Sequence, residues 1–360
     1  MKKEVVILLS LLLISGCVKQ IKDISDDYKV KVTNLNSDLD NYPIILLHGH
    51  AVSVGEAANF LREYKETGSF GKFSAFQERL DIDKLYFNKN IILPSENINE
   101  ICIKKDWDKK TSIRTTYYVN DNGEFDDQQS IETYAKRLEK VVDILKECTK
   151  SSKVNLMGHS MGGLVIREYA KNHPQDVNKV ITIGTPNKGI SGEYLGIKSS
   201  CPTFRYEDDI ECKEMTVGSD FLMNLEDNQK INYYSIAGIL GSKGYLGSAS
   251  CFNYGNCNDG VVCTQLSELK NGKNYIVYTQ ETKSFLNDVG NGIHADLIEP
   301  DTVLGQEVYN IVKNILMNKS PEENFHKWDN ICKSKNQINY NEFLSKIDLI
   351  KEKIITLLSP

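Results

Sequence analysis

The sequence predicts a doubly wound α/β domain with a mostly parallel sheet and a cap or lid insertion. Short apolar runs, of the kind buried on both faces of a parallel sheet, alternate with segments of helical periodicity. One apolar run stops at Gly158-His159-Ser160-Met161-Gly162-Gly163, and a helical pattern follows at once. These two observations also locate the candidate site.

The first 16 residues predict a signal peptide. Lys2 and Lys3 precede the apolar run 5–14, which is too short to span a membrane. The following "LLISGC" resembles the lipobox of prokaryotic lipoproteins, so Cys17 is expected to be lipidated and 17–41 to form a polar tether. We therefore expect an extracytoplasmic protein anchored to the membrane of the cell envelope, or a secreted one if Cys17 is not lipidated.

One domain is predicted over 42–318. It opens with the strand "YPIILL" and continues with 53–129, interpreted as an insertion that carries one helix and two strand candidates. The predicted elements that follow are helix 130–150, strand 153–158, helix 162–174, strand 179–184, strands 231–239 and 273–280, and helix 301–318. The segment 189–230 is either a lid over a site or an excursion pinned by a disulfide. A C-terminal helical extension is predicted over 319–360.

Charge and cysteine content narrow the function classes. The net charge of −6 comes without a dense basic cluster, so nucleic acid is not an expected partner. Of nine cysteines, eight lie beyond Cys17, and an even count in an oxidising compartment suggests disulfides. We expect Cys201 to pair with Cys212, and two of Cys251, Cys257 and Cys263 to pair with each other. Zinc spacing is lacking, so no metal is predicted.

Ser160 is the predicted nucleophile. The pattern G-x-S-x-G lies between a strand and a helix, where crowding at the tight turn requires glycine at 158 and 162. The helix that follows presents free N–H groups toward a developing oxyanion. A serine hydroxyl needs a base, so a histidine and an acid are required downstream.

His294 is the predicted base among six histidines. His159 lies inside the turn and should point away from Ser160, and the remaining candidates are His48, His173 and His326. His48 precedes the serine, His173 lies at a helix end, and His326 lies in a polar C-terminal region. His294 alone occupies a loop between the last predicted strand and the last long helix.

Asp259 is the predicted acid, because it follows the strand 231–239 and lies beside Gly260. The competitors are Asp220, Asp227, Asp288 and Asp296, of which Asp288 is the best substitute. Two backbone N–H groups are expected to bind the oxyanion, those of Met161 and of His50 in "LLHGH".

Together "IILLHGH", "VNLMGHSMGGLVIREY", "VITIGTPNKG" and "NDGVV" resemble the α/β-hydrolase superfamily. The chain is most similar to its bacterial triacylglycerol lipase and esterase group and to GPI inositol deacylases. The resemblance implies hydrolysis of acyl or lipid esters through an acyl-enzyme on Ser160, Asp259 and His294. Some of these lipases bind structural calcium near the histidine loop, but Asp288 and Asp296 form no ligand pattern, so no cofactor is predicted.

Two alternatives stay open. An acyltransferase or thioesterase would use the same three residues with another acceptor or acyl donor. A non-catalytic surface binding protein would keep the fold and lose a catalytic residue, yet all three residues are present. No protein partner is predicted.

Overall fold

A computed structural model of the chain describes residues 42–50, 62–63, 71–104, 106–190, 193–194, 197–198, 209–240, 251, 257–279, 293–328 and 332. The chain divides into two units, Met1–Asp40 with Lys313–Ser320 and Asn41–Val312 with Pro321–Pro360, and the second contains the sheet. The predicted signal peptide, Cys17 and the tether lie outside the described residues. Within the described ranges, no helix has the length and apolar character needed to cross a membrane.

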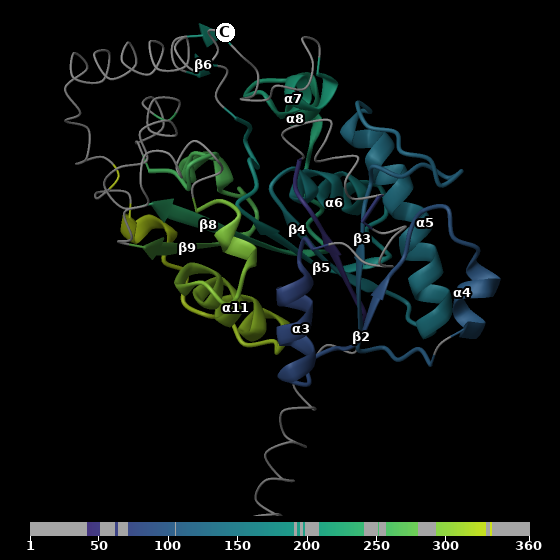
Figure 1. Ribbon diagram of the computed structural model, residues 1–360. Helices are drawn as coiled ribbons and strands as arrows, with labels where there is room; N and C mark the ends of the chain where they lie inside the picture. The colour runs from purple at the N-terminus through teal and green to yellow at the C-terminus, as the bar shows by residue number, and fades with distance from the viewer. Residues whose placement is uncertain are drawn as a thin grey trace, which may run out of the picture. The chain divides into compact units, whose positions relative to one another are not determined.

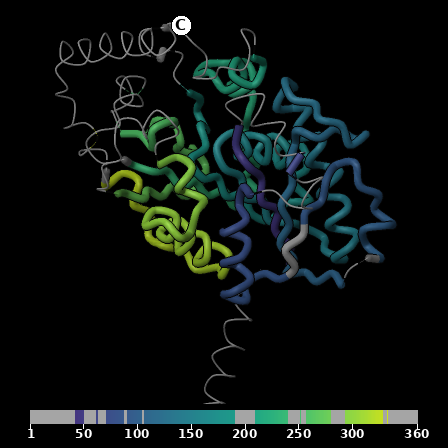
Figure 2. Tube along the Cα trace, viewed as in Figure 1, coloured from purple at the N-terminus to yellow at the C-terminus, as the bar shows by residue number. Residues whose placement is uncertain are grey.

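A parallel sheet forms the centre of the larger unit. Across the described residues it has seven strands in the order β2-β3-β1-β4-β5-β8-β9, and each neighbouring pair is parallel. The strands are β1 (Ile44–Leu47), β2 (Phe87–Ile91), β3 (Thr111–Thr115), β4 (Val154–His159), β5 (Val177–Ile183), β8 (Asn232–Leu240) and β9 (Lys273–Thr279). The first strand along the chain, β1, lies inside the sheet. The next two strands lie on one side of β1 and the later strands lie on the other side, which confirms the doubly wound prediction (Figure 2).

Helices cover both faces of this sheet, which explains why a central strand such as β1 is apolar on both faces. All four residues of β1 are fully buried. Alternate side chains of a strand face opposite sides, and Ile45 and Leu47 pack in one core cluster with α5 (Ile131–Thr149) and α6 (Met161–Asn172). Ser130 begins α5 as its N-cap, accepting the N–H of Thr133.

The helices α3 (Ser74–Ile82) and α11 (Val303–Leu316) cover the other face. The Gln77 amide in α3 donates to the Ser112 carbonyl in β3 at 3.0 Å and accepts from Arg114 at 2.9 Å. Phe76 of α3 in turn packs against Tyr309 of α11, with ring centroids 5.3 Å apart. Figure 1 shows these two helices side by side and away from α5 and α6.

The segment 53–129 corrects one sequence interpretation. Its described part supplies β2 and β3 to the main sheet, together with α3 and α4 (Ile98–Lys104). This part is therefore an edge of the sheet and not an insertion. The pattern was hard to read because β2 lies at the sheet edge and carries polar residues.

The segment 189–230 lies between β5 and β8. Its described residues form the short antiparallel pair β6 (Glu193–Tyr194) and β7 (Ile197–Lys198), then α7 (Ile210–Met215) and α8 (Asp220–Asn224). Whether it acts as a lid stays a prediction. Short 3-10 helices occur at Thr264–Ser267, Asp296–Ile298 and Phe325–Trp328. Apart from Cys332, the extension beyond Trp328 lies outside the described residues.

Three disulfides cross-link described parts of the chain. Cys251 pairs with Cys263, as expected for two of that group of three. Cys257 pairs with Cys332, and Cys102 of α4 pairs with Cys148 of α5. Cys212 is disulfide-bonded as well, and its predicted partner Cys201 lies outside the described residues.

Candidate active site

Ser160 occupies a tight turn between β4 and α6, with φ 53° and ψ −130°. A Cβ atom on Gly158 would lie 2.6 Å from the backbone of Gly162, and one on Gly162 would lie 2.2 Å from the carbonyl oxygen of His48. Neither position accepts a side chain. The left-handed φ of a serine is unusual and costs energy, which the surrounding contacts must offset.

Ser160, Asp259 and His294 all lie at the carboxyl edge of the parallel sheet. They follow β4, β8 and β9 respectively, and β5 separates the first of these strands from the other two. His294 Nδ1 donates to Asp259 Oδ2 at 2.7 Å, and both side chains are buried. The other Asp259 oxygen accepts the N–H groups of Val261 at 3.0 Å and Val262 at 2.8 Å. These bonds fix the orientation of the carboxylate.

The second ring nitrogen of His294 is available for chemistry. Its Nε2 atom is buried and, within the described part of the chain, has no hydrogen-bond partner. His159 Nε2 donates to the carbonyl of His294 at 2.9 Å, and the two ring centroids are 4.5 Å apart. Burial holds the pKa of His159 well below its usual value, so this ring is neutral. The histidine next to Ser160 therefore anchors the His294 loop.

The competing acids and histidines have other surroundings. Asp227 pairs with Arg167 at 2.8 Å, Asp220 begins α8, and Asp296 begins a 3-10 helix. The substitute acid Asp288 lies outside the described residues. His173 and His326 lie 3.8 Å and 3.9 Å from Glu139 and Glu268 respectively.

Of the two predicted oxyanion donors, Met161 follows Ser160 directly, and His50 follows a glycine that approaches Ser160. Met161 is the first residue of α6, where backbone N–H groups have no partner inside the helix. The loop after β1 approaches from the other side, because a Cβ atom on Gly49 would lie 2.7 Å from Ser160 Cβ. His50 follows directly. The structure thus brings all five predicted site residues to one edge of the sheet.

The side chain of His50 was missed by sequence reasoning, which used only its backbone. Its Nε2 atom lies 2.6 Å from Glu211 Oε2 and 3.7 Å from Asp209 Oδ2. Burial alone would lower the pKa of His50, but the two carboxylates outweigh it and raise the pKa. No local sequence pattern predicts this cluster, because Asp209 and Glu211 are far from His50 in the sequence.

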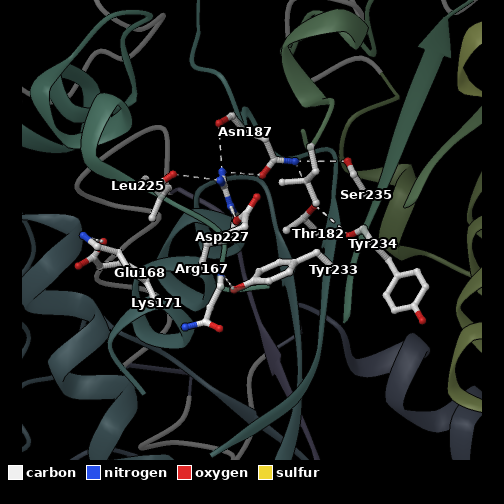
Figure 3. Close-up of polar contacts among 12 residues, drawn as sticks. Arg167, Glu168, Lys171, Thr182, Asn187, Leu225, Asp227, Tyr233, Tyr234 and Ser235 are labelled. Carbon is white, nitrogen blue, oxygen red and sulfur yellow. Dashed lines mark hydrogen bonds and ion pairs between the residues drawn. The ribbon is translucent and has the colours of Figure 1, made fainter. Parts of the chain in front are cut away.

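A buried polar network surrounds Arg167 of α6, the helix that begins after Ser160 (Figure 3). Arg167 of α6 bonds Asp227 at 2.8 Å and the Asn187 carbonyl at 3.0 Å. The Asn187 amide donates to Thr182 at 3.1 Å and Ser235 at 3.3 Å. The network therefore joins the helix after Ser160 to the loop after β5 and to β8.

Among the residues that the structure describes, one group of side chains could offer ligands to a metal ion. The potential ligands His50, Asp209 and Cys212 lie close together. Cys212 is in a disulfide and cannot offer a thiolate, so the cluster falls short of the usual ligand number.

Comparisons with known proteins agree with this architecture. A family model described as "alpha/beta hydrolase fold" matches residues 94–221. The chain is similar to triacylglycerol lipases of Pseudarthrobacter phenanthrenivorans and Burkholderia plantarii, at 56% identity over 41 residues in each case. That stretch is 11% of this chain and 13% and 12% of the two lipases, so the match spans about an eighth of their length.

A solved structure of a lipase from Bacillus licheniformis is also similar. It has 15% identity and a TM-score of 0.42, and the likeness covers 76% of this chain and 91% of that one. Because these values are low, the fold assignment rests on the strand order and the family match.

Proposed function

We propose that this protein is a serine carboxylic ester hydrolase. The proposal starts from its α/β-hydrolase fold and from its resemblance to the lipase and esterase group. Ser160 is the nucleophile, His294 the general base and Asp259 the acid that orients it. The observation that carries the proposal is the buried pair of Asp259 and His294, 2.7 Å apart, at the same sheet edge as the strained Ser160 turn. The Nε2 atom of His294, which has no hydrogen-bond partner among the described residues, is suited to proton transfer.

The geometry supports a two-step reaction. His294 Nε2 accepts the proton of Ser160 Oγ as this oxygen attacks the ester carbon. The tetrahedral oxyanion is stabilised by the N–H groups of Met161 and His50, each contributing about 3 kcal/mol. His294 then gives the proton to the leaving alcohol. Water, activated by the His294 ring, then hydrolyses the acyl-enzyme and releases the carboxylic acid product.

Acyl esters, including lipid esters, are the proposed substrates. Two relatives with a matching segment are named triacylglycerol lipases. We propose lipid anchoring at Cys17 outside the cytoplasmic membrane, because "LLISGC" follows a short apolar run. A Cys17→Ser variant should move from the membrane fraction to the soluble fraction, and an unchanged distribution would contradict the anchor.

Hydrolysis of p-nitrophenyl esters, from acetate to palmitate, tests the activity on oxidised protein that begins after Cys17. Ser160→Ala should abolish turnover, whereas Ser95→Ala, in a turn far from the site in sequence, should retain it. The chain-length optimum would separate an esterase from a lipase, and products formed with added alcohol would reveal acyl transfer. Folded protein that cleaves no ester, or a Ser160→Ala variant that still does, would refute the proposal.

A further inference from the structure

The buried charges around His50 have no role in the reaction described so far, which uses only its backbone N–H. Glu211 is fully buried and Asp209 nearly so, and both carboxylates face the His50 ring. A buried carboxylate is costly unless it is paired and hydrogen-bonded. The cluster therefore has to offset a large desolvation cost.

Glu211 itself is held firmly. Its second oxygen accepts the phenol O–H of Tyr134 from α5, and the Tyr118 phenol lies 3.5 Å from the oxygen that faces His50. Asp209 is the N-cap of α7 and accepts the N–H of Cys212 at 3.2 Å. The acids are thus fixed to α5, α7 and the segment after β3, so they can fix His50 in turn.

The residue before His50 is held as well. The carbonyl oxygen of Gly49 accepts the phenol O–H of Tyr117 and the Nδ1–H of His48, each at 2.7 Å. His48 Nε2 in turn bonds Thr116 Oγ1 at 2.8 Å. Burial lowers the pKa of His48 to about 4 and raises that of Tyr117 well above its usual value, so the first stays neutral and the second keeps its proton.

These contacts determine where the N–H of His50 points. The Gly49 carbonyl and the His50 N–H belong to one peptide group, which is planar and trans, so they point in opposite directions. Fixing the oxygen on Tyr117 therefore aims the N–H the other way. Fixing the ring on Glu211 prevents rotation of the residue that carries this N–H.

We propose that Tyr117 and Glu211 are positioning residues, which hold the Gly49–His50 peptide so that its N–H meets the oxyanion formed at Ser160. The inference rests on the proposed function, because it assigns the groups that hold the second oxyanion donor. Glu211 lies on α7, within the segment 189–230, so this segment takes part in building the site.

Conservative variants test the inference in the oxidised enzyme that begins after Cys17. Tyr117→Phe removes only the phenol O–H, and Glu211→Gln removes the charge and replaces one acceptor oxygen by an amide donor. The matched controls are Tyr275→Phe, whose phenol lies 3.4 Å from the Pro321 carbonyl, and Glu214→Gln, on the same helix but bonded to the N–H of Ile131 at 2.6 Å.

We expect each test variant to lower kcat by about 10- to 100-fold, because a displaced donor costs less than a deleted one. KM should stay within about twofold, since the ester ground state does not need this donor. A trifluoromethyl ketone that forms a tetrahedral oxyanion with Ser160 should bind more weakly by a similar factor. Both controls should match wild type.

Equal kcat and ketone affinity in Tyr117→Phe and the controls would overturn the inference, and so would a change confined to KM. If Glu211→Gln fails to fold, Tyr117→Phe decides alone. Full activity in the test variants with an inactive Ser160→Ala would refute the positioning roles but leave the esterase standing. A Ser160→Ala variant that keeps its turnover would refute both the positioning roles and the serine esterase.

Discussion

The two halves of the candidate site are held together in different ways. In the nucleophile half, Ser160 lies on a turn that glycines allow, and the Asp259 carboxylate is oriented by neighbouring backbone N–H groups. In the His50 half, side-chain charges from α7 meet a histidine that follows β1. Local packing therefore shapes one half, and long-range charge pairing shapes the other.

This difference teaches where each kind of change should act. Substitutions in the nucleophile half should remove the chemistry and leave the fold largely intact. Changes of charge or pH in the His50 half should alter stability and the rate together. The following predictions test this division, beginning with the largest expected effect.

Asp259→Asn should have the largest effect, and it should lower activity far more than stability. An amide can donate to His294 Nδ1 and so favour the wrong tautomer of the ring, which lowers kcat by about 10⁴-fold. The free energy of unfolding should change by only about 1–2 kcal/mol, because the amide keeps part of the hydrogen bonding. Ester kinetics and urea titration measure the two quantities, with the exposed Asp301→Asn as control. A small loss of kcat would assign the acid to another residue.

Arg167→Met tests the contrast from the other direction, because Arg167 brings a buried charge pair to α6, the helix that begins after Ser160. Both side chains of the Arg167–Asp227 pair are nearly buried, at 5% and 6% exposure. Removing one partner leaves a buried charge, so we expect a loss of about 3–5 kcal/mol in unfolding free energy.

The kcat of folded Arg167→Met should be close to that of wild type. Lys136→Met, which removes an exposed pair with Glu132, is the control and should leave stability unchanged. A large drop in kcat with normal stability would mean that charge, and not packing, positions Ser160.

The smallest effect is a pH dependence of opposite sign in the two halves. The pKa of His159 is lowered by burial, so its stabilising contribution is present above about pH 6.5 and is lost as the pH falls. The pKa of His50 is raised, because the hydrogen bonds and charges of Asp209 and Glu211 outweigh its burial. Its contribution is present below about pH 6.5 and is lost as the pH rises through the raised value.

Urea titrations across pH should resolve the His50 contribution as the difference between wild type and Glu211→Gln. That difference in unfolding free energy should be largest in acid and shrink in alkali. The same experiment with His159→Asn should show the variant losing less stability than wild type in acid. Parallel pH profiles for wild type and Glu211→Gln would contradict the charge pairing.

The sequence was sufficient for the fold class and for locating the turn at Ser160, because both depend on local patterns. The catalytic roles of Ser160, Asp259 and His294 stay predictions. Apolar runs marked the strands, and the glycines around Ser160 marked the turn, so the order of serine, acid and histidine followed the order of the strands. The strands β2 and β3 were read as part of an insertion, and Cys257 with Cys332 could not be paired in advance. Such contacts join distant segments and leave no periodicity.

The hydrogen bond from His159 to the carbonyl of His294 also bears on how such motifs are read. In G-x-S-x-G the residue before the serine is written as any amino acid, yet here its side chain bonds the loop that carries His294, the proposed base. An aliphatic residue at 159 would leave that carbonyl without this donor, at a cost of about 1–3 kcal/mol if nothing replaced it. The residue at this variable position of the motif thus affects the loop that contains His294. Two chains with the same motif can therefore differ in the contacts that hold this loop.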